Sequence, residues 1–166
     1  NEIDYLCSLK FSEDELTYLG SLRYMKPDYI DFLRLFHFQR QHIKVVAIEG
    51  SDEEIDILIN GPWLYTILYE VYILSIINEI YFRNTVTDHE NNILEARKRL
   101  VDKINYVKQN TDAEFKFSDF GTRRRYSRDW HNEVVQTLKE NLPDNFTGTS
   151  NVYFAMRYNL TPIGTM

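Results

Sequence analysis

The last fifty or so residues alternate between strand-like and helical segments, and this alternation restricts the fold more than any other feature. Helices are expected between the strands, one capped by Ser127 and one over residues 151–159. The expected strands cover residues 114–120, 145–149 and 161–165. Strands that alternate with helices pair in parallel through crossover connections. We therefore expect the α/β class, with ligands bound at the carboxyl ends of the strands.

The first part of the chain favours helices and one β-hairpin. A capping box over residues 12–15 predicts one helix start, and Pro27, whose missing N–H suits the first turn, predicts another. The β-branched runs 44–48 and 55–59 predict a hairpin that turns at residues 50–53.

The most apolar segment, residues 64–83, is long enough to raise the question of a membrane span. Glu70, Asn78 and Glu79 interrupt it, and a charged residue at mid-membrane costs about 2.5–3.5 kcal/mol. We therefore expect a helix buried in the core of a soluble protein and no membrane partner.

A further helix is expected over residues 88–107, followed by a polar break at residues 110–112. This break divides the chain into an α+β N-terminal domain with the hairpin and the long helices, and a second domain that begins the parallel sheet. The expected boundaries are residues 1–112 and 113–166.

Charge and cysteine content exclude several classes of function. The 166 residues carry a formal charge of −6, which argues against nucleic-acid binding driven by net charge. The single cysteine, Cys7, cannot form an internal disulfide, and the four histidines are scattered without zinc-site spacing. The N-terminus lacks the pattern of a signal peptide. We expect a cytoplasmic protein.

One local cluster reverses the acidic balance. Residues 116–128 contain five basic residues and one acidic residue, which gives a local charge of +4. The arginines of this cluster, residues 123–125, follow Gly121 at a predicted strand end, and the guanidinium group matches phosphate and carboxylate geometry. Ser127 begins a helix whose free N–H groups favour anions. The cluster predicts an anion site, whereas a solvated surface paired with nearby carboxylates is the equally weighted alternative.

Three segments resemble nicotinate phosphoribosyltransferases in order and spacing. They are Asp119-Phe-Gly-Thr-Arg-Arg-Arg-Tyr-Ser127, Gly148-Thr-Ser-Asn151 and Leu160-Thr-Pro-Ile-Gly-Thr-Met166. Gly61-Pro62-Trp63, followed by Glu70 and the apolar helix, is also similar. The resemblance implies synthesis of nicotinate mononucleotide from nicotinate and phosphoribosyl pyrophosphate, coupled to ATP hydrolysis, in NAD synthesis. It also implies an irregular α/β barrel after the N-terminal domain, Mg²⁺ with the pyrophosphate, and a homodimer with shared active sites.

The resemblance assigns roles to individual residues. The residue matching Phe120 stacks on the pyridine ring, the one matching Arg123 contacts phosphate, and the one matching Thr165 lies at the base pocket. Ser150 replaces an Asp of nicotinamide-using relatives, and a neutral donor suits the carboxylate of nicotinate. The expected substrate-binding residues are Phe120, Gly121, Thr122, Arg123, Arg125, Gly148, Ser150, Asn151 and Thr165.

The resemblance also sets expectations about extent. In the family a phosphorylated His follows the Gly-Thr motif, and here it would come just after Met166, so no catalytic residue is expected within this chain. The sequence also lacks the family's N-terminal aromatic segment and its later phosphate-binding segments. We expect an internal piece, less than half of an enzyme, that is inactive alone.

Two rival functions remain open at this point. The first is a sibling phosphoribosyltransferase that uses nicotinamide or quinolinate. The second is a non-catalytic module that binds an acidic partner through the Arg123–Arg125 cluster.

Overall fold

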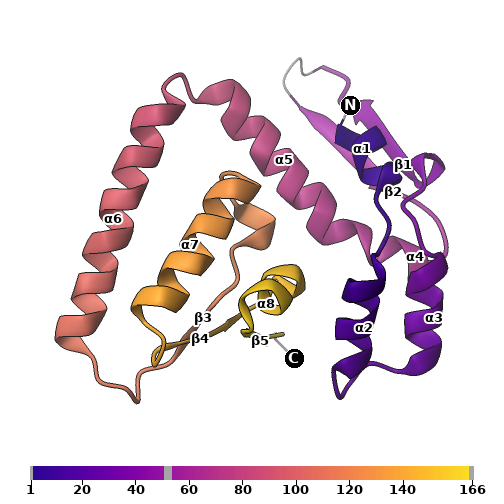
Figure 1. Cartoon of the computed structure of the whole chain (residues 1–166). Coiled ribbons are helices and arrows are strands. Elements are labelled where there is room, and N and C mark those ends of the chain that lie inside the picture. Colours follow the sequence, from indigo (N-terminus) through magenta and orange to yellow (C-terminus); the bar gives the residue numbers. More distant parts are fainter. Residues whose placement is uncertain (1, 51–53, 165–166) are drawn as a thin grey trace. The chain divides into compact units, whose positions relative to one another are not determined.

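Residues 2–50 and 54–164 are described by a computed structural model, and the chain divides into two units, Asn1–Ile73 and Leu74–Met166 (Figure 1). Thr165 and most of the expected hairpin turn lie outside the described residues. The division falls within one helix, so it does not coincide with the break expected at residue 112. The domain boundary at residue 112 stays a prediction.

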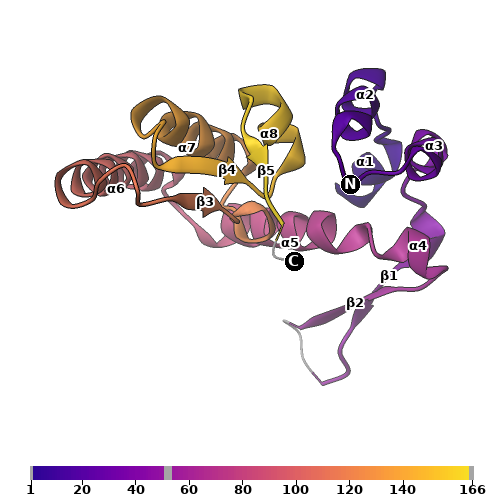
Figure 2. The same cartoon turned by 90° about the horizontal axis from the view of Figure 1, so that it is seen from below.

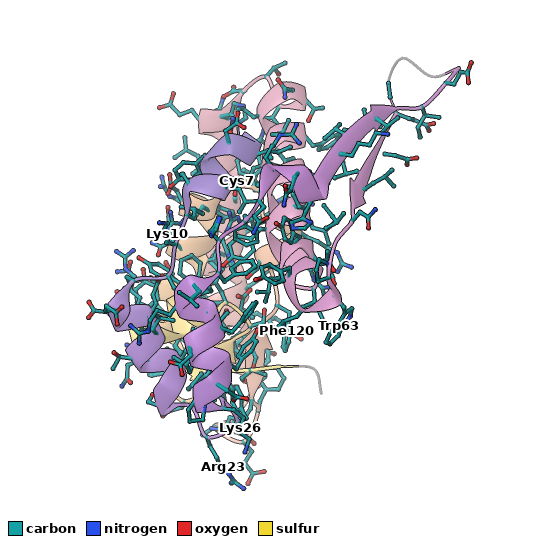
Figure 3. The ribbon with its side chains drawn as sticks, turned by 90° about the vertical axis from the view of Figure 1, so that its right-hand side faces the viewer. Cys7, Lys10, Arg23, Lys26, Trp63 and Phe120 are labelled. Carbon is teal, nitrogen blue, oxygen red and sulfur yellow. The ribbon has the colours of Figure 1, made fainter. Side chains whose placement is uncertain are left out.

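The first unit begins with three helices, α1 (Glu2–Ser8), α2 (Glu13–Ser21) and α3 (Pro27–Leu35). The predicted capping box precedes α2: the Glu15 N–H donates to Ser12 Oγ, and the Ser12 N–H donates to Glu15 Oε2 at 2.8 Å. Pro27 is the first residue of α3, as expected. Figure 3 shows Arg23 and Lys26 in the turn between α2 and α3. Local chemistry therefore determines both helix starts.

A short 3₁₀ helix, η1 (Arg40–His42), leads into the expected hairpin, β1 (Ile43–Ala47) and β2 (Ile55–Ile59), which pairs antiparallel with Ile43 opposite Ile59. An aromatic cluster forms the core of this unit. Phe38 makes edge-to-face contacts with Tyr69 and Tyr72, and the fully buried Tyr69 hydroxyl accepts from the Gln39 N–H at 2.8 Å. Such ring pairs are stabilising beyond the apolar area they bury.

The apolar segment forms two helices, α4 (Trp63–Thr66) and α5 (Tyr69–Thr85). Its expected burial is wrong: Tyr69 and Ile73 are buried, but Tyr81 is 59% exposed and Trp63 74% exposed (Figure 3). The reason is geometric, because the described residues cover only one stripe of a helix that is apolar on several faces. Among the described residues, no helix has both the length and the apolar character needed to cross a membrane.

The second unit contains the expected parallel sheet. After α6 (His89–Asn110), the order is β3 (Phe117–Asp119), η2 (Thr122–Arg124), α7 (Arg128–Asn141), β4 (Phe146–Thr149), α8 (Val152–Tyr158) and β5 (Thr161–Pro162). The strands lie in the order β3-β4-β5, and both pairs are parallel. Helices α7 and α8 pack on this sheet (Figure 2). This confirms the α/β class, whereas closure into a barrel stays a prediction.

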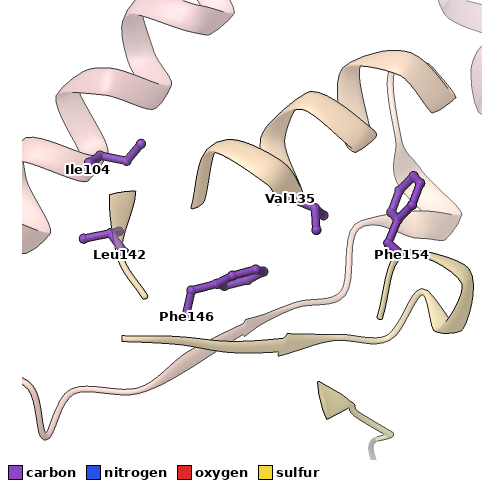
Figure 4. Close-up of a cluster of buried hydrophobic side chains, with 5 residues drawn as sticks. All are labelled: Ile104, Val135, Leu142, Phe146 and Phe154. Atoms are coloured by element: carbon purple, nitrogen blue, oxygen red, sulfur yellow. The ribbon is translucent and has the colours of Figure 1, made fainter. Parts of the chain in front are cut away.

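A hydrophobic cluster joins the helices of the second unit to its sheet (Figure 4). Val135 of α7 is completely buried, and Phe146 of β4 and Phe154 of α8 are almost so. Ile104 of α6 and Leu142 complete the cluster. Burying side chains of this size contributes about 1.5–3 kcal/mol each, so the cluster fixes the sheet beneath α7 and α8.

Candidate active site at the carboxyl ends of the strands

Two of the three segments singled out in the sequence leave the sheet side by side. Strand β3 ends at Asp119 and β4 ends at Thr149, and these two residues are partners in the parallel register. Just beyond them, the Ser150 N–H donates to the Asp119 carbonyl at 2.8 Å. We call residues 119–125 and 149–151 the strand-end site. Parallel strands bring both segments to one edge of the sheet, where α/β proteins bind ligands.

The Asp119 carboxylate lies at the centre of the strand-end site and accepts three hydrogen bonds. Oδ1 accepts from the Gly121 N–H at 2.9 Å. Oδ2 accepts from the Thr149 hydroxyl at 2.6 Å and lies 2.7 Å from His131 Nε2. Because a carboxylate only accepts, His131 carries a proton on Nε2. Both side chains are largely buried, with 12% of Asp119 and 5% of His131 exposed.

These contacts keep Asp119 ionised. Burial alone raises the pKa of this carboxyl, but hydrogen bonding and charge from His131, together with bonds from Thr149 and Gly121, outweigh it. The result is a pKa below the ordinary value of 3.8. A buried negative charge therefore lies at the base of the segment that carries the arginines.

Two predicted site glycines have structural reasons for lacking a side chain. A Cβ on Gly148 would lie 2.1 Å from the Thr161 carbonyl oxygen of the neighbouring strand. A Cβ on Gly121 would lie 2.9 Å from Asp119 Oδ1 and 3.4 Å from His131 Nε2. Gly148 thus allows β5 to approach β4, and Gly121 leaves room for the Asp119–His131 pair.

Thr122 and Asn151 connect the two segments. The Asn151 amide nitrogen donates to Thr122 Oγ1 at 3.2 Å, and its carbonyl oxygen accepts from the Phe154 N–H to cap α8. The Asn151 backbone N–H donates to Thr149 Oγ1 at 3.0 Å. The structure therefore brings these predicted residues together, with their polar groups engaged by one another.

The three consecutive arginines have different surroundings. Arg125 pairs with Glu79 of α5 at 2.6 Å, and the two side chains are 16% and 21% exposed. Arg123 and Arg124 are exposed, and the Arg123 carbonyl accepts from the Asn78 amide at 3.0 Å. Arg125 is therefore paired with a carboxylate, as in the alternative to an anion site, but this pair is largely shielded from solvent instead of forming a solvated surface.

Phe120 lies apart from the ring contacts that its neighbouring phenylalanines make. Phe117 contacts Phe115 and Phe146, but among the described ring contacts Phe120 has none, and it is 47% exposed. Ser150 is half-buried next to it in the strand-end site. Thr165, the remaining predicted residue, lies outside the described residues.

Sequence reasoning missed the centre of the site. Asp119 had been counted only as the one negative charge among arginines, and His131 and Thr149 were assigned no role. His131 lies twelve residues from Asp119 in the sequence, and Thr149 lies thirty residues from it. Contacts over such separations leave no local pattern in the sequence. The parallel register of strands 114–120 and 145–149 was the available signal, because it places Asp119 opposite Thr149.

A groove in the same unit lies beside the start of α7 and has a mixed charge. An open groove of about 400 Å³ lies beside the N-terminus of α7, where Ser127 caps the helix by accepting from the Trp130 N–H at 3.1 Å. Its lining includes three acidic residues, Glu79, Asp129 and Glu133, and three basic ones, Arg83, His89 and Arg97. The anion site expected near this helix start stays a prediction.

Comparison with known proteins identifies the family. Residues 1–78 match the model of the nicotinate phosphoribosyltransferase (NAPRTase) N-terminal domain, and residues 115–166 match that of the nicotinate phosphoribosyltransferase (NAPRTase) family. A nicotinate phosphoribosyltransferase of Xanthomonas euvesicatoria pv. vesicatoria (strain 85-10) is 51% identical over 165 residues, 99% of this chain and 41% of the relative. The chain thus spans about two fifths of the length of the curated relatives it matches.

Solved structures agree with the family models. The crystal structure of nicotinate phosphoribosyltransferase from Porphyromonas gingivalis matches 99% of this chain and 41% of its own at a TM-score of 0.86 and 30% identity. The corresponding enzyme from Vibrio cholerae matches 98% of this chain and 39% of its own at a TM-score of 0.85 and 31% identity. The chain therefore belongs to the nicotinate phosphoribosyltransferase family.

Proposed function

We propose that this chain carries part of the substrate site of an enzyme that makes nicotinate mononucleotide from nicotinate and phosphoribosyl pyrophosphate in NAD synthesis. In this reaction the pyridine nitrogen forms a bond to the anomeric carbon of ribose, and the bond from that carbon to the pyrophosphate oxygen breaks. The observation that carries the proposal is the pairing of β3 and β4. It brings the segment with the exposed residues Phe120 and Arg123 next to the segment with Ser150, at one sheet edge of a chain with this family membership.

Each strand-end residue has a role suited to this chemistry. The Phe120 ring offers a face on which a pyridine can stack. Arg123 offers a bidentate donor to phosphate oxygens and neutralises charge on the departing pyrophosphate. The Ser150 hydroxyl donates to the carboxylate of nicotinate, whereas an Asp there would repel it. Positioning and charge neutralisation, without a protein nucleophile, are sufficient for such a displacement.

Magnesium and ATP belong to the proposal as participants supplied with the substrates. Among residues 2–50 and 54–164, no group of three His, Cys, Asp or Glu side chains could hold a metal ion. The buried Asp119 carboxylate is engaged by three donors of the chain itself. The described residues do not fit a Mg²⁺ ion held by this chain alone, and the proposal has Mg²⁺ bound with the pyrophosphate. The ATP coupling and the shared site of a homodimer are likewise proposed from family membership.

One contact argues against the alternative function, a module that binds an acidic partner. Arg125, the third member of its proposed surface, is held by Glu79 and is mostly buried. A partner that needed all three guanidinium groups would have to break this pair.

The test is an assay of the full-length gene product with phosphoribosyl pyrophosphate, Mg²⁺ and either nicotinate, nicotinamide or quinolinate, each with and without ATP. We expect nicotinate mononucleotide as the main product and ATP-stimulated turnover. Preference for nicotinamide or quinolinate would favour the sibling enzymes. No product with any base, together with tight binding of an acidic macromolecule, would favour the module.

A further inference from the structure

We propose that Asp119 is a positioning residue whose carboxylate holds both substrate-binding segments of the strand-end site in their working arrangement. The proposal rests on the function proposed above and adds to it the group that orients Phe120, Arg123 and Ser150. Family membership assigns those residues to the substrates and leaves the organisation of the segments open. The contacts of Asp119 supply that organisation.

The carboxylate connects three parts of the fold. Through Gly121 it fixes the turn that carries Phe120 and Arg123, and through Thr149 it holds the end of the neighbouring strand. Through His131 it is anchored to α7. The backbone of the same residue also holds the second segment, because its carbonyl accepts from the Ser150 N–H.

The contacts continue into a closed network. The Thr149 hydroxyl, which donates to Asp119, also accepts from the Asn151 N–H at 3.0 Å. Asn151 in turn donates to Thr122, which is one residue from the Gly121 N–H that Asp119 binds. Each segment is therefore held at two points. Such a network fixes backbone geometry more strongly than isolated bonds do.

Two features indicate that this arrangement serves more than stability. His131 Nδ1 is buried without a hydrogen-bond partner among the described residues, a cost that the chain accepts while Nε2 serves Asp119. Gly121 lacks the Cβ that would lie 2.9 Å from the carboxylate. Apolar side chains in place of Asp119 and His131 would remove the unpaired nitrogen and the need for a glycine at position 121. They would also leave the Gly121 N–H without its acceptor and the two segments unconnected.

The same contacts favour positioning over a direct catalytic role. Three of the roughly four lone-pair sites of the carboxylate are occupied by the chain's own donors, and only 12% of the side chain is exposed. Asp119 therefore acts through the residues it orients, which is why the test must separate positioning from simple loss of fold.

The experiment compares Asp119→Asn with Val135→Ala in the full-length gene product. Asparagine keeps the shape but replaces one acceptor oxygen by a donor, so at least one of the three bonds is lost or must reverse its direction. Val135 is completely buried on α7, and its apolar side chain makes none of the hydrogen bonds of the network, so its truncation lowers stability without removing any of these bonds. Thermal unfolding, kcat and KM for both substrates, and amide exchange of residues 117–124 are measured for each.

We expect Asp119→Asn to lower kcat/KM by about 10- to 100-fold, the scale for a small misplacement of reacting groups. Amide exchange around Gly121 should also be faster in Asp119→Asn. Val135→Ala should lose at least as much thermal stability as Asp119→Asn. Its kcat/KM and its amide exchange in residues 117–124 should nevertheless stay near the wild-type values. Parallel losses in the two variants, or an Asp119→Asn enzyme as active as wild type, would overturn the proposal. If Asp119→Asn does not fold, Thr149→Val and Thr149→Ser replace it. We expect Thr149→Val to lower kcat/KM and Thr149→Ser, which keeps the hydroxyl, to retain it. Equal losses of kcat/KM in both variants would count against the network.

An inactive wild type would instead refute the proposed function. The exchange data then test only the claim that Asp119 holds the two segments. Faster amide exchange at Gly121 in Asp119→Asn but not in Val135→Ala supports this claim. Equal exchange in the two variants overturns it.

Discussion

Replacement of Gly148 by alanine should separate β5 from β4. The added Cβ would lie 2.1 Å from the Thr161 carbonyl oxygen and 2.8 Å from Ile163 Cδ1. Restoring the ordinary contact distance of 3.4 Å requires the strands to move apart by about 1.3 Å. The hydrogen bond from the Ile163 N–H to the Thr149 carbonyl, now 3.0 Å, cannot survive such a shift in the same direction. Overpacking together with this lost bond should cost about 2–4 kcal/mol.

Thermal unfolding of the full-length gene product measures the effect. The control is Gly164→Ala, because a Cβ at Gly164 meets nothing within 4 Å and the backbone there is not in the left-handed region. We expect Gly148→Ala to lower the unfolding midpoint by at least about 4 °C, whereas Gly164→Ala should stay close to wild type. Equal midpoints for the two variants would refute the close approach of β4 and β5.

Three other predictions concern the strand-end site. Phe120→Leu should raise KM for nicotinate about 2- to 10-fold, as expected for loss of ring stacking, with little change in the unfolding midpoint because Phe120 is 47% exposed; a loss of stability with unaltered KM would contradict the stacking role. Ser150→Asp should reduce the preference for nicotinate over nicotinamide, measured as the ratio of kcat/KM for the two bases, and an unchanged ratio would leave Ser150 only a structural role. The pKa of Asp119 is depressed in the fold, so its stabilisation is present above the ordinary value of 3.8 and is lost as pH falls through the lower native value. The difference in unfolding midpoint between wild type and Asp119→Asn should therefore be steady from neutral pH to about pH 5 and shrink toward pH 3, and a gap that grows with acidity would contradict this sign.

The elements that could be predicted from the sequence are those fixed by local chemistry. The capping box at residues 12–15, Pro27 at the start of α3 and Ser127 at the start of α7 each act within one turn. The parallel sheet could also be predicted, because alternating strands and helices leave few topologies. The expected strands were longer than the observed ones, since Phe115 and Lys116 lie outside β3, and β5 covers only Thr161–Pro162.

The burial and the polar contacts could not be predicted, because they depend on residues distant in sequence. Arg125 and Glu79 are 46 residues apart, and a run of three arginines gives no sign of which one is paired. The exposure of α5 could not be predicted either, because an apolar helix is buried only where other segments cover it. The substrate-binding roles of the site residues stay predictions from the family motifs, and the structure adds the contacts of Asp119, His131 and Thr149 beside them.

The most direct test of the proposed site compares Arg123→Ala with Arg124→Ala in the full-length gene product. Both residues are exposed and adjacent, so the two variants remove the same formal charge at neighbouring positions. If Arg123 binds phosphate, Arg123→Ala should lower kcat/KM for phosphoribosyl pyrophosphate by about 10- to 150-fold, which corresponds to the 1.5–3 kcal/mol of a charged hydrogen bond. Arg124→Ala should lower it much less. Unchanged kinetics in Arg123→Ala, or equal losses in both variants, would contradict a phosphate site at the end of β3 and leave the arginines as a solvated surface.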